Sequence, residues 1–277
     1  YPAGGQYGGG PMSESASRIL GILRERGGYI SGQKISRELG ISRTAVWKNV
    51  EKLRQTGYTI DAVSNRGYRL MQSVDLPTSD EIGRYLGQVS LNPRVVYMKT
   101  VDSTNSLAMM LAARGAAHGT VVTADMQTSG RGRKGREWHS PPGSNLYLSM
   151  ILRPPVPPAE ASQIPILTVM ASIRALRRLA PDLTCSVKWP NDIYCGGKKI
   201  SGTLCEMKAE MDSVDHVVVG TGINVNTDPS KENMPETATS LFMETGRRYI
   251  RAELAAMLLE DFQRAYDAWI AEGSLEP

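Results

Sequence analysis

A short run of glycines and cations in the middle of the chain carries its clearest chemical signal. Residues 130–136 hold four cations and three glycines, directly after a β-rich run at Gly119–Met126. So much charge does not pack into a core, whereas backbone amides and guanidinium groups on a glycine-rich loop can close around a polyanion. The Gly-Lys-Ser/Thr ending of a Walker loop is missing, so a P-loop NTPase is not predicted. An exposed basic loop or a second nucleic-acid contact would have the same composition.

Three other short runs offer polar groups, and each also has a purely structural explanation. Ser103–Asn105 provides hydroxyls and an amide, but it could simply cap a helix over Ser106–Arg114. Lys188 lies in a β-like run and could act only as an edge-strand solubiliser. Gly220 and Gly222 flank β-rich residues, which fits close strand packing as well as a ligand. No metal-ligand spacing links the three histidines, His118, His139 and His216.

The elements that must position these residues are a mixture of strands and helices. A second strand is predicted at Asn145–Leu152, and helices at Gln163–Leu179 and Tyr249–Ala271. Three further β-like runs follow one another in hairpin-like order, which favours antiparallel pairing. They are Val187–Cys195, Lys199–Lys208 and His216–Asn224. The predicted class is therefore α+β (α/β-type), with a mixed sheet flanked by helices.

The N-terminal residues predict a winged helix-turn-helix. Two helices and two later β-like runs are expected at 15–26, 31–39, 58–63 and 68–70. Gly40 permits a left-handed turn after the second helix, and Ser42 can cap a third. That third helix buries Val46, Val50 and Leu53 at helical spacing. The run Ser-Asn-Arg-Gly between the β-like segments suits a tight hairpin turn, which would form the wing.

Charge separates this module from the rest of the chain. Residues 12–73 hold eleven Lys and Arg against five Asp and Glu, a net charge of +6. Residues 74–277 hold 21 against 23, a net charge of −2. A basic helix-turn-helix fits duplex DNA, with its second, recognition helix in the major groove. The alternative is a small helical domain with a solvated basic face.

Five residues of this module are predicted to contact DNA. Arg43 and Thr44 stand at the start of the third helix, where base edges are reached. Lys48, Lys52 and Arg66 are better placed for phosphates, which hold register without reading sequence. The exposed or buried state of Trp47 is left open, since packing and DNA contact fit it equally well.

Length and composition limit the remaining possibilities. A chain of 277 residues exceeds one compact domain. No apolar stretch approaches the roughly 20 residues of a membrane helix, and no secretory signal pattern begins the chain. Cys185, Cys195 and Cys205 are too few and too evenly spread for a disulfide scaffold or a CxxC metal site. We expect a cytoplasmic protein with reduced thiols and no membrane partner.

The predicted domain layout follows from these composition shifts. A Gly-rich flexible tail or cloning remnant covers residues 1–11, and the winged helix-turn-helix covers 12–73. A short linker, 74–77, contains Pro77 and leads into a second domain at 78–277.

Five runs, in order and spacing, resemble the family of bifunctional biotin protein ligases and biotin operon repressors. They are DSTN (Asp102–Asn105), GRGRKGREW (Gly130–Trp138), KWPND (Lys188–Asp192), KKISGTLCE (Lys198–Glu206) and GTGINVN (Gly220–Asn226). With the N-terminal module, the resemblance covers residues 12–277. It implies a biotin/lipoate ligase-like catalytic domain. A small C-terminal β-barrel usual in that family is expected to be absent or truncated here, together with its contribution to ATP and acceptor handling.

The resemblance also implies roles for individual residues. Arg131, Arg133 and Lys188 resemble the catalytic cations. Trp138 and Asn224 resemble contacts to ATP near its adenine, and Asp192 resembles a Mg²⁺ ligand. The implied biotin-binding set is Ser103, Thr104, Asn105, Gln127, Arg131, Gly132, Arg133 and Lys188. Hydroxyls and amides of this kind suit the carbonyl and two N–H groups of the biotin ureido ring.

The implied activity is ATP-dependent and has two steps. Biotin and ATP, with Mg²⁺, would give biotinyl-5′-AMP, and a lysine of a biotin carboxyl carrier protein would then take the biotin. The adenylate-bound chain is expected to form a homodimer that binds operator DNA and represses biotin genes. A non-enzymatic, ligand-sensing transcription regulator and a lipoate-protein ligase of related fold are the alternatives.

Overall fold

The computed structural model describes residues 13–72, 74–87, 93–230, 232 and 234–272. The described chain forms two compact units, divided after Asp75. This division lies inside the expected linker at 74–77. No helix of the described residues has both the length and the apolar character needed to cross a membrane.

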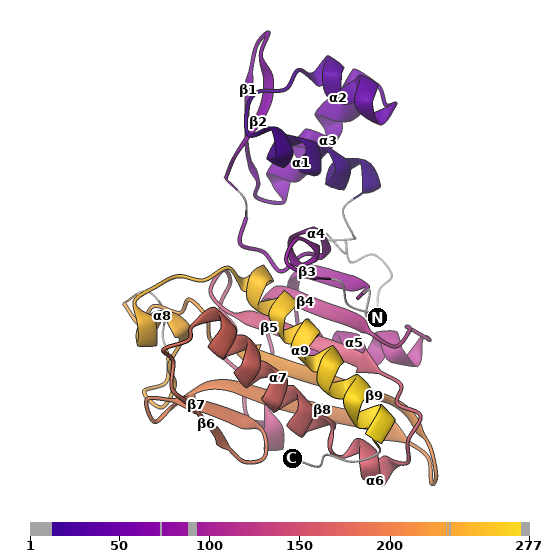
Figure 1. The fold of residues 1–277 in the computed structure, drawn as a ribbon, viewed down its shortest axis with the longest axis vertical. Helices are drawn as coiled ribbons and strands as arrows, with labels where there is room; N and C mark the ends of the chain where they lie inside the picture. Colours follow the sequence, from indigo (N-terminus) through magenta and orange to yellow (C-terminus); the bar gives the residue numbers. More distant parts are fainter. Residues whose placement is uncertain (1–12, 73, 88–92, 231, 233, 273–277) are drawn as a thin grey trace. The chain divides into compact units, whose positions relative to one another are not determined.

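The N-terminal unit contains three helices and one hairpin (Figure 1). Ser13, Ser31 and Ser42 cap the helices, because each side-chain hydroxyl accepts a hydrogen bond from the backbone of the first turn. The elements are α1 (Glu14–Arg26), α2 (Gly32–Leu39), α3 (Arg43–Gln55), β1 (Thr59–Val63) and β2 (Gly67–Gln72). The predicted winged helix-turn-helix is thus confirmed.

Apolar side chains at helical spacing hold this unit together. Ile19, Leu23 and Ile35 pack with the stripe of α3 that the sequence predicts. The wing turn depends on Gly67, whose φ is +98° and whose added Cβ would lie 2.0 Å from the Ile30 carbonyl oxygen. Only glycine permits that approach, so the hairpin packs directly on the segment before α2.

The second unit is built on a seven-stranded sheet with strand order β3-β4-β5-β9-β8-β7-β6. Strands β3 and β4 are parallel, and the other neighbours are antiparallel, as the hairpin-like sequence pattern predicts. The strands are β3 (Val95–Val101), β4 (Thr120–Gln127), β5 (Leu146–Leu152), β6 (Cys185–Lys188), β7 (Asp192–Cys195), β8 (Lys198–Ala209) and β9 (Val214–Ile223).

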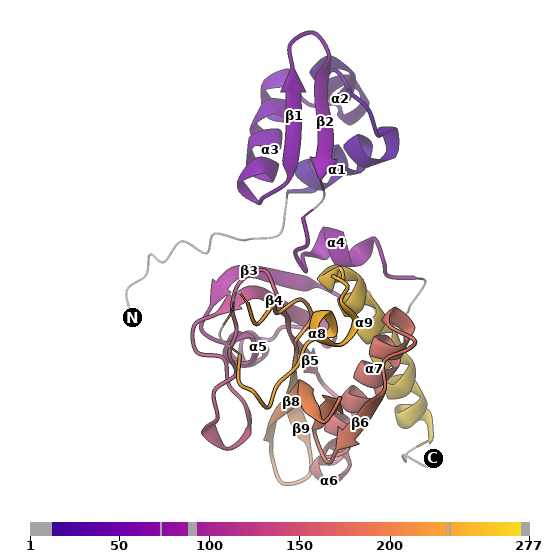
Figure 2. The same cartoon turned by 90° about the vertical axis from the view of Figure 1, so that its left-hand side faces the viewer.

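Helices cover both faces of this sheet. Figure 2 shows α5 on one side of it, and α7 and α9 on the other, where they bury the larger apolar cluster. Alternation along β5 directs Leu146 and Leu148 to the large cluster, and Ser149 to α5. The helices are α4 (Ser79–Gly83), α5 (Thr104–Ala113), α6 (Pro158–Ala161), α7 (Ile164–Leu179), α8 (Leu241–Thr245) and α9 (Arg251–Glu272).

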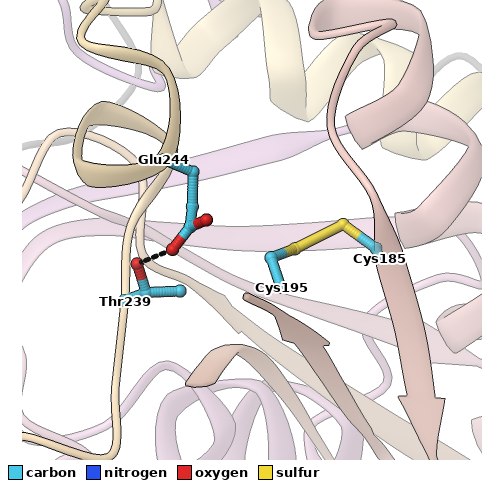
Figure 3. Close-up of a disulfide and its surroundings, with 4 residues drawn as sticks. All are labelled: Cys185, Cys195, Thr239 and Glu244. Atoms are coloured by element: carbon cyan, nitrogen blue, oxygen red, sulfur yellow. Dashed lines mark hydrogen bonds between the residues drawn. A yellow bond between two sulfur atoms is a disulfide. The ribbon is translucent and has the colours of Figure 1, made fainter. Parts of the chain in front are cut away.

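The expectation of reduced thiols is wrong for two of the three cysteines. Cys185 and Cys195 form a disulfide across the β6–β7 hairpin (Figure 3). They are ten residues apart in sequence, but the antiparallel register places them directly opposite each other. Spacing alone could not reveal this, because it depends on where the hairpin turns. Cys205 is free, and burial raises the pKa of its thiol to about 12.

A buried ion pair fixes the start of α9 against the sheet. The Arg251 side chain is 1% exposed and lies 2.9 Å from the Asp125 carboxylate at the end of β4. Arg251 also donates to the Asn145 carbonyl oxygen at 3.1 Å. Replacing one member of a buried pair leaves the other charge uncompensated, which is costly.

We therefore expect Arg251→Ala to lower the free energy of unfolding of the second unit by about 3–5 kcal/mol. Equilibrium urea unfolding followed by circular dichroism measures this. Arg264→Ala is the matched control, because Arg264 is likewise an arginine of α9 that pairs with a carboxylate, Asp261, but it is 62% exposed. Its loss should cost about 1 kcal/mol or less. Equal shifts for the two variants would contradict the structural role of the buried pair.

Candidate active site

The site begins with a floor of three glycines on the α5 face of the sheet. This glycine floor consists of Gly202 on β8 and of Gly220 and Gly222 on β9, with Gly202 and Gly222 paired across the two strands. An added Cβ at Gly220 would lie 2.0 Å from Asn105 Oδ1, and one at Gly222 would lie 2.5 Å from Trp138 Cε2. The glycines therefore let side chains of distant segments lie directly on the sheet.

A polar cavity of about 50 Å³ lies above this floor. Seven of the predicted biotin-binding residues line it: Ser103, Thr104, Asn105, Gln127, Arg131, Gly132 and Arg133. Ser103 also caps α5, so its structural and functional explanations are compatible. Tyr147 closes part of the wall; burial raises the pKa of its phenol, which donates to the Pro141 carbonyl oxygen at 3.0 Å.

A continuous hydrogen-bond network fixes the wall of the polar cavity. The Thr104 backbone N–H and hydroxyl both donate to Gln127 Oε1, at 2.8 and 3.1 Å. The Gln127 amide then donates to Ser140 Oγ at 2.9 Å. The hydroxyl of Ser149 lies 2.8 Å from the hydroxyl of Thr104 and donates to Asn105 Oδ1 at 2.6 Å. Neither serine was predicted, since a lone serine in a loop, like Ser140, or in an apolar strand, like Ser149, carries no sequence signal.

The arginine loop, Gly130–Trp138, is folded back on itself beside this cavity. The Gly132 N–H donates to the Arg136 carbonyl at 2.7 Å, and the Trp138 N–H donates to the Gly130 carbonyl at 2.8 Å. Gly130 is required at the base, because an added Cβ would lie 2.4 Å from the Trp138 carbonyl oxygen. The loop is thus a closed turn held by its own backbone.

Two side chains outside the loop hold two of its three arginines. Arg131 pairs with Glu206 on β8 at 3.3 Å, and Arg133 donates to Asn191 Oδ1 at 2.6 Å. Glu206 also accepts a hydrogen bond from the Asn105 amide at 2.8 Å. One carboxylate therefore joins the loop to the wall of the polar cavity. Glu206 lies in the KKISGTLCE run. The run was recognised as a motif, but nothing in its pattern gave Glu206 a role.

A second and larger cavity, of about 450 Å³, adjoins the first and is strongly cationic. Lys188 lies in its lining, so the loop and Lys188 share one cavity as the sequence predicts. Two carboxylates, Glu137 and Asp192, also line it. The cations that line it are Arg133, Lys134, Arg136, Lys188 and Lys199. Such a lining suits a polyphosphate.

Trp138 lies between the two cavities and lines both. Lys199 Nζ lies 5.3 Å from the centre of its ring. The indole Nε1 is buried, and no described residue accepts a hydrogen bond from it. An aromatic face and an unpaired donor at the boundary of a polyanion site could both engage a nucleotide base.

The surroundings of two predicted site residues, Asn224 and Asp192, differ from those expected of an ATP contact and a Mg²⁺ ligand. Asn224 lines neither cavity; it is buried and its amide donates to the Thr239 carbonyl at 3.0 Å. Asp192 lines both cavities, but Lys199 Nζ lies 2.8 Å from its carboxylate. Among the described residues, no group of three or more His, Cys, Asp or Glu side chains could hold a metal ion. Any cation at Asp192 would need further ligands from a substrate.

The N-terminal unit carries a separate candidate interface. All five predicted DNA contacts are exposed: Arg43, Thr44, Lys48, Lys52 and Arg66. The Arg66 guanidinium lies 4.5 Å from the centre of the Tyr29 ring, and that of Arg69 lies 4.9 Å from it. The Tyr29 hydroxyl donates to Asp61, and this bond is the main cause that raises the pKa of the phenol. Tyr29 and Arg69 were not predicted, because stacking across the wing depends on tertiary contact.

Comparison with known proteins agrees with this geometry. Residues 97–224 match the biotin/lipoate A/B protein ligase family, and residues 16–69 match a helix-turn-helix domain. The chain is 40% identical over 247 residues to the bifunctional ligase/repressor BirA of Bacillus subtilis, covering 88% of this chain and 76% of that protein. The corresponding BirA of Escherichia coli is 33% identical over 256 residues, which cover 92% and 78% of the two chains.

A solved structure has a similar fold over part of the chain. The biotin protein ligase from Aquifex aeolicus, in complex with biotin and ATP, is 33% identical with a TM-score of 0.55. The match covers 65% of this chain and 72% of that one. This structure, the two matched domains and the relatives that span most of the chain together identify the family of the sequence. The chain belongs to the biotin/lipoate A/B protein ligase family, among the bifunctional ligase/repressors with an N-terminal helix-turn-helix domain.

Proposed function

We propose that this chain joins biotin to ATP as biotinyl-5′-AMP, transfers the biotin to a lysine of a biotin carboxyl carrier protein, and represses biotin genes by binding operator DNA. The observation that carries this proposal is the shared boundary of the two cavities. A small polar cavity suited to the ureido ring adjoins a cationic cavity suited to phosphates, and the arginine loop lines both. A carboxylate between them could attack an α-phosphate.

The polar network suits biotin recognition. Serine and threonine hydroxyls and the Asn105 and Gln127 amides provide both donors and acceptors for the ureido group. The polar cavity is small, about 50 Å³, because Trp138 lies directly on the glycine floor. We propose that biotin binding moves Trp138 and part of the arginine loop away from that floor.

Charge explains the first chemical step. The carboxylate of biotin is a poor electrophile, and its attack on the α-phosphate releases pyrophosphate and forms a mixed anhydride. Negative charge grows on the phosphate oxygens in that step, so preorganised cations lower its barrier. Arg131, Arg133 and Lys188 supply this charge. To do so, Arg131 would exchange Glu206 for the ligand, and Arg133 would exchange Asn191.

A magnesium ion would enter with ATP rather than occupy a protein cage. Mg²⁺ usually binds through one or two carboxylates, several waters and substrate phosphates. Asp192 and Glu137 in the lining of the cationic cavity fit that donor set. When bound, the ion would neutralise charge on the phosphates.

Transfer and repression complete the proposed cycle. The ε-amine of the acceptor lysine has an ordinary pKa near 10.4, so it must lose a proton before it attacks the anhydride. We propose that adenylate binding orders the arginine loop, which favours a homodimer whose two winged helices reach two half-sites. Carrier protein, ATP and operator DNA place the reaction in the cytoplasm.

The proposed function is tested by adding biotin, ATP and an apo carrier protein and blotting with streptavidin. We expect labelling that requires both biotin and ATP and that excess lipoate does not reduce. A chain that binds biotin but labels no carrier would instead be a ligand-sensing regulator.

We expect Lys188→Ala to slow adenylate formation about a hundredfold or more, because losing one preorganised donor to a developing anion costs about 2.7–4 kcal/mol. Single-turnover release of pyrophosphate measures this rate. Lys208→Ala is the control, since Lys208 lies on β8, is 65% exposed and pairs with Asp215. A near-normal pyrophosphate burst from Lys188→Ala would remove Lys188 from the catalytic set.

We expect Gly220→Ala to weaken biotin binding about tenfold or more, because the new Cβ would meet Asn105 Oδ1 at 2.0 Å and displace it. Titration calorimetry with biotin gives the dissociation constant. Gly83→Ala in α4 is the control, since its added Cβ meets nothing within 4 Å. Equal affinities for the two variants would show that Asn105 does not position biotin.

We expect biotin and ATP together to raise operator affinity, and Arg131→Ala to abolish that increase, because coupling requires the ligand to favour one state of the loop. The probe is a duplex that the wild-type chain enriches from a random pool. Fluorescence anisotropy gives the affinity, and sedimentation equilibrium gives the mass. If biotin plus ATP change neither the operator affinity nor the mass of the protein in solution, the coupling is ruled out.

A further inference from the structure

Trp47 departs from the burial pattern of its own helix. The other large apolar residues of α3, Val46, Val50 and Leu53, are completely buried, whereas Trp47 is 52% exposed. Isolated exposed apolar residues are common on protein surfaces. The position of Trp47 is what gives the exposure meaning, because it lies on the same face of the helix as two predicted base contacts.

That face opens into a groove of about 810 Å³ within the N-terminal unit. Arg43 and Trp47 are four residues apart, and Thr44 and Trp47 are three apart, so these side chains are neighbours on α3. The N-terminal end of α2, with its cap Ser31, and the wing, with Asn65, line the rest of this wing groove. The indole therefore lies among hydroxyls, amides and a guanidinium, with the smaller apolar side chains Ala62 and Val63 on the wing side of the groove.

Charge indicates what fills the wing groove. The module that carries it holds eleven Lys and Arg against five Asp and Glu over residues 12–73, a net charge of +6. Lys48 is exposed one position along α3 and Arg66 is exposed in the wing. Duplex DNA complements that charge, and a helix of this size fits its major groove.

We propose that Trp47 reads thymine: its indole packs against the C5-methyl group of a thymine beside the bases that Arg43 and Thr44 reach. This inference rests on the proposed operator binding and adds the base that is read. The thymine methyl is the apolar feature of the major groove, and apolar side chains recognise it by contact. Trp47 and Val63 are the two large exposed apolar side chains that line the groove, and the indole of Trp47 offers the larger surface for that contact.

The test removes the methyl group and the indole separately and together. The probe is the duplex that the wild-type chain enriches from a random pool in the presence of biotin and ATP. A second duplex of the same sequence carries deoxyuridine in place of every thymine. Anisotropy titrations of both duplexes, over a range of salt concentrations, give the affinities and the salt dependence.

We expect the wild-type chain to bind the thymine duplex about tenfold more tightly than the deoxyuridine duplex. Trp47→Ala should bind the thymine duplex about tenfold less tightly and should not distinguish the two duplexes. The two losses are then non-additive, as a direct contact requires. Trp47→Phe, which keeps an aromatic ring, should retain part of the preference for thymine.

Lys48→Ala is the matched control on the same helix. It should lower affinity for both duplexes equally and reduce the salt slope by about 1, as loss of one phosphate contact does. The salt slope of Trp47→Ala should equal that of the wild type. Biotin ligation by each variant reports that the remainder of the chain is folded and active.

Each other outcome overturns the proposal in a recognisable way. A Trp47→Ala chain that keeps the full preference for thymine shows that another group reads the methyl. A change in mass by sedimentation equilibrium, with unchanged preference, would assign Trp47 to a contact between copies of the chain. If the wild-type chain enriches no duplex at all, the repressor function itself fails and the reading of thymine fails with it.

Discussion

Close approach to a bare sheet surface is the constraint on which the site depends. Gly202, Gly220 and Gly222 leave a patch of backbone on the α5 face, and both α5 and the arginine loop lie against it. A side chain at either position of β9 would meet Asn105 or Trp138 at less than van der Waals distance. The same patch thus aligns the wall of the polar cavity and brings the cations of the loop to its edge.

The arginine loop is held by groups that an anionic ligand can replace. Arg131 and Arg133 are paired with Glu206 and Asn191, whereas the loop backbone is closed by its own hydrogen bonds. The pairs at Arg131 and Arg133 involve exposed side chains, so each contributes little stability and can be exchanged cheaply. The pair between Arg251 and Asp125, in contrast, is buried and holds α9 against the sheet. Binding can therefore change the loop without disturbing the sheet beneath it.

Much of the fold follows from local patterns. A serine cap before α3, a left-handed glycine after α2 and apolar residues at helical spacing predict the three N-terminal helices to within a residue at most of the predicted ends. Hairpin-like β runs predict the antiparallel part of the sheet. The residues of the arginine loop and of Ser103–Asn105 could be predicted as a site because their motifs occur in a recognised order. Ser149, Tyr147 and Lys199 could not, because a single polar residue in a strand has no distinguishing pattern.

The sequence by itself determined the two-part organisation, the basic charge of the first part and the motifs that meet at the cavities. Those features depend on neighbours along the chain, where periodicity and composition carry the information. Tertiary structure alone decided that Cys185 faces Cys195, that Asn224 lies away from both cavities and that Trp47 stands exposed beside Arg43. Each of these depends on strand register or on which face of an element is covered, and contacts between distant segments set both.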